Sequence, residues 1–87
     1  MQVQGAAISL GGNNLVITVV DMGLLENHGE ADMAIETLSA KFGGVAVVLM
    51  AQREDGSPVY YGDQDLVGLL RDVPVDQMPW REYNVGG

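Results

Sequence analysis

The chain has 87 residues, a formal net charge of −8 and no cysteine. This length allows one domain, which we assign to residues 1–87. The lack of cysteine excludes disulfides and every zinc or iron–sulfur site that needs thiolate ligands. With 47% hydrophobic and 18% charged residues, the composition is typical of a globular protein and not of a disordered one.

The charge also limits the partners that we expect. The sequence has twelve acidic and four basic side chains, and proteins bind a phosphate backbone mainly through Lys and Arg. We therefore expect no direct contact with nucleic acid. We interpret the acidity first as a source of solubility. The second interpretation is an acidic surface that imitates nucleic acid and so binds a basic protein partner.

From the first residues of the sequence we expect no signal peptide. Met1-Gln2-Val3-Gln4 lacks the basic segment and the long apolar run of a secretory signal peptide. The longest apolar stretch, residues 45–51, is too short to span a bilayer. We therefore expect a cytoplasmic protein with no membrane partner.

The first part of the chain predicts a β-hairpin. Residues 6–10 alternate between two faces, and 15–20 are rich in β-branched side chains. Between them, Gly11-Gly12-Asn13-Asn14 tolerates the positive φ angles of a tight loop.

The next part predicts the longest helix. For residues 22–29 the sequence fits either an irregular loop or a short helical turn. Residues 30–41 carry apolar side chains at helical spacing, and Gly43-Gly44 can supply a left-handed C-terminal cap. The apolar face of this predicted helix consists of Ala31, Ile35, Leu38 and Phe42.

A second hairpin and a shorter helix follow. Residues 45–52 and 59–61 predict two strands around a turn at Asp55-Gly56, and Pro58 predicts an edge position. Asp63 is a good N-cap, so we expect a helix that ends before Pro74. For residues 75–85 we expect a turn and a short last strand.

The predicted order is β-β-α-β-β-α, with or without a last β-strand. It indicates an α+β fold with a small mixed or antiparallel sheet of four to five strands. We expect two helices on one face of this sheet. Without the first strand, the order is that of a ferredoxin-like variant.

Two predicted strands, residues 15–20 and 45–51, are apolar on both faces. A strand with one face in water alternates apolar and polar residues. Each apolar side chain left in water forgoes about 1.5–3 kcal/mol of burial free energy. If both helices cover one face, a second copy of the chain must cover the other, or the chain must fold over itself. We expect a homodimer formed sheet to sheet or through edge strands.

Two groups of residues are candidates for function. Asp21, Glu26 and His28 provide the mixed ligands that suit a divalent metal, but their spacing matches no established motif. We therefore expect Asp21 to end a strand and His28 to lie in a solvated loop, and we assign no metal and no cofactor.

The second candidate is an aromatic and cationic patch for a protein partner. Trp, Tyr and Arg dominate interface hot spots, and these residue types are concentrated near the C-terminus. The predicted partner-binding residues are Tyr60, Tyr61, Trp80, Arg81 and Tyr83. For Trp80 we favour a structural role, in which it closes the core and donates its indole N–H to a nearby carbonyl.

No motif names a reaction. The first hypothesis is a small acidic, non-enzymatic interaction module with an accessory or regulatory role, present as a homodimer. One alternative is a small-ligand or metal-dependent enzyme with its site near Asp21, Glu26 and His28. Another is a subunit that acts within a larger hetero-assembly.

Overall fold

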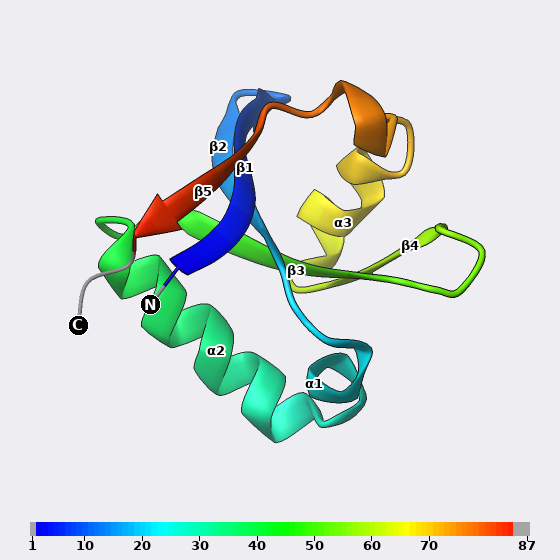
Figure 1. The fold of residues 1–87 in the computed structure, drawn as a ribbon. Coiled ribbons are helices and arrows are strands. Elements are labelled where there is room, and N and C mark those ends of the chain that lie inside the picture. The colour runs from blue at the N-terminus through cyan, green and yellow to red at the C-terminus, as the bar shows by residue number, and fades with distance from the viewer. Residues whose placement is uncertain (1, 85–87) are drawn as a thin grey trace.

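The computed structural model describes residues 2–84 and contains a five-stranded mixed sheet with helices on both sides (Figure 1). The strands are β1 (Gln2–Leu10), β2 (Asn13–Val19), β3 (Ala46–Gln52), β4 (Pro58–Tyr61) and β5 (Trp80–Asn84). The helices are α1 (Met22–Glu26), α2 (His28–Lys41) and α3 (Gln64–Leu70), followed by the 3₁₀ turn η1 (Val75–Gln77). The predicted α+β class and order of elements are confirmed.

The strands lie in the order β4-β3-β2-β1-β5. The neighbours β2 and β3 are parallel, with Ile17 opposite Val48, and α2 forms the crossover between them. The other three pairs of neighbours are antiparallel. The two edges of the sheet are therefore formed by β4 and β5, which come from different parts of the chain.

Glycines make both predicted hairpin turns. Gly11 and Gly12 have φ angles of 55° and 80° and join Leu10 to Asn13. This loop is shorter than expected, because Asn13 and Asn14 belong to β2. Gly56, with φ 87°, turns the second hairpin.

The predicted helix ends are also present. The backbone N–H of Gly44 donates to the carbonyl of Ser39 over 2.7 Å and closes the last turn of α2. The carboxylate of Asp63 accepts hydrogen bonds from the N–H groups of Asp65 and Leu66 and caps α3. The segment before α2, predicted as either a loop or a helical turn, forms the short helix α1. The side chain of Asn27 caps α2.

The expectation of two helices on one face is wrong. In Figure 1, α1 and α2 lie on one side of the sheet, and α3 lies on the other. Two separate core clusters follow from this arrangement: Leu38 of α2 packs with Leu49, and Leu66 of α3 packs with Val48. Because Val48 and Leu49 are consecutive in β3, they point to opposite faces and need cover on both sides.

The apolar strands are thus covered within one chain. The side chains of Ile17, Val48 and Leu49 are fully buried. The covered faces remove the reason for which a sheet-to-sheet homodimer was expected. The chain folds over itself because α3 follows edge strand β4 and returns over the face that α2 leaves free.

The finer ferredoxin-like arrangement is not confirmed. In that split βαβ arrangement, another strand separates the two strands that a crossover helix joins. Here β2 and β3 are direct neighbours on the two sides of the α2 crossover.

Candidate functional site

The predicted aromatic patch is divided between the two edges of the sheet. Tyr60 and Tyr61 belong to β4, whereas Trp80, Arg81 and Tyr83 belong to β5. Three strands separate β4 from β5, so the five residues do not form one continuous surface. A partner-binding role for either half stays a prediction.

Trp80 has the structural role that the sequence favours. Its ring is half-buried against the core on the α3 side, and its indole N–H donates to the carbonyl of Val75 over 2.7 Å. On the opposite face of β5, the ring of Tyr83 contacts Phe42 edge-on at 5.3 Å. Arg81 is exposed.

The two consecutive tyrosines of β4 point to opposite faces, as expected. Tyr60 packs with the core under α3, and Tyr61 packs with the core under α2. The Tyr61 hydroxyl donates to Asp32 Oδ1 over 2.8 Å, which raises the Tyr61 pKa above its ordinary value of 10.0. The His28 ring lies 5.1 Å from the Tyr61 ring.

His28 therefore contacts Tyr61, which is not one of the candidate metal ligands. Within residues 2–84, no three His, Asp or Glu side chains gather closely enough to hold a metal ion. Asp21 precedes α1, and Glu26 ends it. The alternative of a metal site at Asp21, Glu26 and His28 therefore has no geometric support in this part of the chain.

A groove of about 400 Å³ lies beside α2, where β1 begins and β2 ends. Its lining is mostly apolar, and Glu30 and Lys41 lie at its two ends along α2. Met33 also lines it and is 68% exposed, more than any other large apolar side chain in residues 2–84. The remaining apolar lining residues are Val3, Val20, Leu24, Ala34 and Leu38.

Thr18 forms part of the floor of this groove and is fully buried. Its hydroxyl has no hydrogen-bond partner among the described residues. A buried hydroxyl without a partner costs about 1–3 kcal/mol, so Thr18 is a local weak point of the core.

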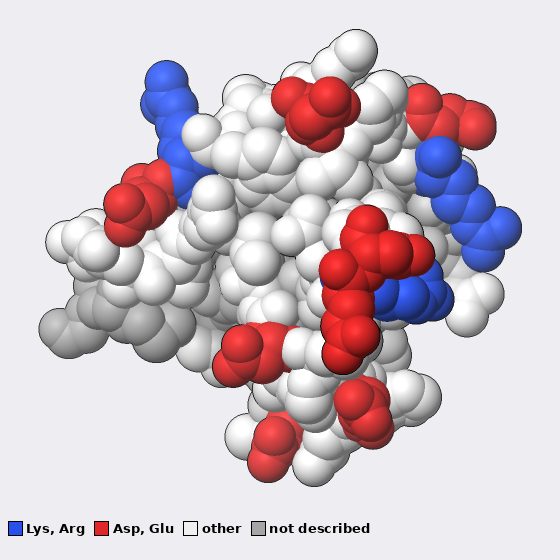
Figure 2. All heavy atoms as spheres, turned by 45° about the vertical axis from the view of Figure 1, so that its right-hand side comes forward, with Lys and Arg blue, Asp and Glu red and all other residues white. Residues whose placement is uncertain are grey.

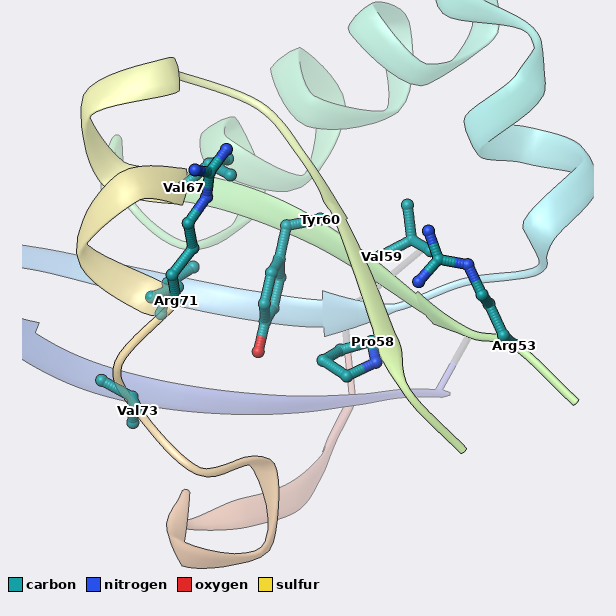
Figure 3. A pocket seen from close by; sticks show the side chains of 8 residues that line it. Arg53, Pro58, Val59, Tyr60, Val67, Arg71 and Val73 are labelled. Carbon is teal, nitrogen blue, oxygen red and sulfur yellow. The ribbon is translucent and has the colours of Figure 1, made fainter. Parts of the chain in front are cut away.

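A second pocket, of about 410 Å³, lies between β4 and the end of α3 (Figure 3). The ring of Tyr60 stands in its centre, with Arg71 on one side and Arg53 on the other. Pro58 and Val73 lie near the end of the ring that carries the hydroxyl. This hydroxyl is the second buried polar group without a partner in residues 2–84.

Sequence reasoning missed both cavities. The signal for the groove was Met33, which lies outside the buried stripe of α2 and is a large apolar side chain on an exposed position. The signal for the pocket was weaker, because Arg53 and Arg71 lie 18 positions apart and come to line one pocket only through the return of the chain after β4.

Acidic side chains outnumber basic ones on the surface drawn in Figure 2. On the face drawn in Figure 2, Asp and Glu are spread over the molecule, with few Lys or Arg side chains between them.

None of the helices within residues 2–84 has the length and apolar character needed to cross a membrane.

No family model, curated protein or solved structure matches this chain. The function must therefore be argued from its own residues.

Proposed function

We propose that the chain is a non-enzymatic interaction module that forms a homodimer through the groove beside α2. The observation that supports this proposal most is the presence of an apolar knob and an apolar groove on one surface. Met33 projects from α2, and the groove runs beside it. A twofold dimer needs such a self-complementary surface, because the same patch serves both copies.

The charges at the ends of the groove fit the same symmetry. Glu30 and Lys41 are 11 positions apart on α2, which corresponds to about 16 Å along a helix. When two copies of α2 pack antiparallel about an axis near Ala34 and Thr37, Glu30 of each copy lies opposite Lys41 of the other. Exposed ion pairs contribute only about 0.2–1 kcal/mol each, so they set the orientation while the apolar contact supplies most of the affinity.

The overall charge opposes this dimer. Each copy carries −8, so two copies repel one another at long range. Added salt screens this repulsion, because the Debye length falls from about 10 Å at 0.1 M to about 3 Å at 1 M. The dimer is therefore expected to become tighter as salt increases. A basic protein partner, alone or in a larger hetero-assembly, would be bound less tightly under the same conditions.

Sedimentation equilibrium at both salt concentrations tests the proposal. The variants Glu30→Lys and Lys41→Glu place like charges opposite one another in a homodimer, so each alone should weaken self-association by about tenfold. Mixed in equal amounts, they should form a heterodimer of near wild-type affinity, because every rim pair is again of opposite sign. The double variant should also regain self-association.

Glu36→Lys is the matched control. Glu36 is exposed on α2 and does not line the groove, yet its substitution changes the net charge as Glu30→Lys does. Both variants make the chain less negative, which by itself favours association. A wild-type chain that stays monomeric at high salt contradicts the proposal, and so does equal behaviour of the two Glu→Lys variants.

A further inference from the structure

The pocket between β4 and α3 concentrates positive charge in an acidic protein. The whole sequence has four Lys and Arg residues, and two of them, Arg53 and Arg71, line this pocket. Arg71 is exposed at the C-terminal cap of α3. Arg53 follows β3, and its guanidinium donates to the Ser57 hydroxyl over 3.3 Å, so the hairpin turn holds it at the pocket.

Tyr60 contributes its ring to the pocket and adds no negative charge. Its hydroxyl oxygen is closed to solvent and has no hydrogen bond within residues 2–84. Burial raises the pKa of Tyr60, so the phenol keeps its proton at neutral pH and stays neutral beside the two arginines.

Part of the pocket wall is apolar. Pro58, Val67 and Val73 line it together with the face of the Tyr60 ring. Its volume of about 410 Å³ lies within the range of small-molecule sites, which is about 300–1,000 Å³. A few convergent polar groups on an apolar lining are typical of such sites.

We propose that this pocket binds a small organic anion. Its carboxylate or phosphate group is held by Arg71 on one side of the Tyr60 ring, and Arg53 adds positive charge from the other side. Its apolar body lies against the Tyr60 ring, Val67 and Val73. Arg71 carries the larger share of the charge interaction, because the nearby Asp55 partly neutralises Arg53. The pocket lies on the α3 side of the sheet, so this site is independent of the dimer proposed at α2.

Three probes separate the parts of this recognition. Phenyl phosphate carries both the anion and the apolar body, inorganic phosphate carries the anion alone, and phenol carries the body alone. Two-dimensional NMR titrations should show phenyl phosphate binding at least about tenfold more tightly than either fragment, with shifts centred on Tyr60, Val67 and Arg71.

The variants Arg71→Gln and Arg81→Gln form a matched pair, since both remove one exposed cation, and Arg81 lies at the opposite edge of the sheet. Arg71→Gln should weaken phenyl phosphate about tenfold, Arg53→Gln should weaken it less, and Arg81→Gln should leave it within about twofold. The proposal is overturned if phenyl phosphate does not shift the pocket resonances. It is also overturned if Arg81→Gln weakens binding as much as Arg71→Gln, or if phenol binds as well as phenyl phosphate.

Discussion

Tyr61 donates its hydroxyl hydrogen to Asp32 Oδ1 over 2.8 Å, and this bond ties edge strand β4 to helix α2 across 29 positions of sequence. The pair lies at the N-terminal part of α2, beside the His28 ring. It adds to the pairing of β4 with β3 and to the packing of Val59 and Tyr61 on the core under α2.

The first prediction concerns alkaline stability. Hydrogen bonding to Asp32 raises the pKa of Tyr61, and burial raises the pKa of Tyr60, both above an ordinary value of 10.0. Above that pH the unfolded chain releases protons that the folded chain retains. The two tyrosines should therefore make their full contribution to the free energy of unfolding below about pH 10, and this contribution should fall above it.

Urea unfolding between about pH 8 and pH 11 measures this dependence. Tyr61→Phe removes one of the two groups, so its free energy of unfolding should fall less steeply with pH. A variant with the wild-type slope would contradict the role of the Tyr61–Asp32 bond.

The second prediction concerns Thr18. Its hydroxyl is fully buried and has no partner among the described residues, so Thr18→Val should raise the free energy of unfolding by about 1–2 kcal/mol. Thr18→Ser is the comparison, because it keeps the hydroxyl, loses the buried methyl group and should lower the free energy of unfolding by about 0.5–1.5 kcal/mol. Urea unfolding compares the two, and destabilisation by Thr18→Val would show that its hydroxyl is satisfied in solution.

The third prediction contrasts two glycines. A Cβ at Gly5 would lie 2.9 Å from the Ile17 carbonyl oxygen and 3.4 Å from the Tyr83 ring, so Gly5→Ala should destabilise the fold by about 1–3 kcal/mol. Gly68 lies within α3 with open space around it, and Gly68→Ala should stabilise by up to about 1 kcal/mol. Thermal unfolding should shift in opposite directions, and equal shifts would argue against the close approach of β1 and β2 at Gly5.

The fourth prediction concerns the cap of α3. The Asp63 carboxylate accepts hydrogen bonds from the N–H groups of Asp65 and Leu66, so Asp63→Ala should cost about 0.5–2 kcal/mol. Asp63→Asn keeps an acceptor oxygen and should cost much less. The same loss in both variants, measured by urea unfolding, would mean that the charge and not the cap supports α3.

Local interactions made most of the secondary structure predictable. The helix over α2 follows from the spacing of Ala31, Ile35 and Leu38, and its end follows from Gly43 and Gly44. The turn at Gly56 and the cap at Asp63 depend only on neighbouring residues. The indole bond of Trp80 was also expected, because a buried indole N–H needs an acceptor and Val75 lies only five positions away.

The candidate sites were not predictable in the same way. The aromatic patch grouped Tyr60 with Trp80 because they lie in one C-terminal stretch, but strand order places them at opposite edges of the sheet. The pocket at Arg53 and Arg71 and the groove at Met33 arise only when separate elements pack together.

Local sequence patterns are enough to place the strands and helices, and they require cover on both faces of β2 and β3, because side-chain alternation is a local property of the backbone. The sharing of this cover between α2 and α3, from opposite sides, arises only when the chain folds. The choice between cover by the same chain and cover by a second copy depends on where the chain returns after β4, and that path is set by contacts between residues far apart in the sequence.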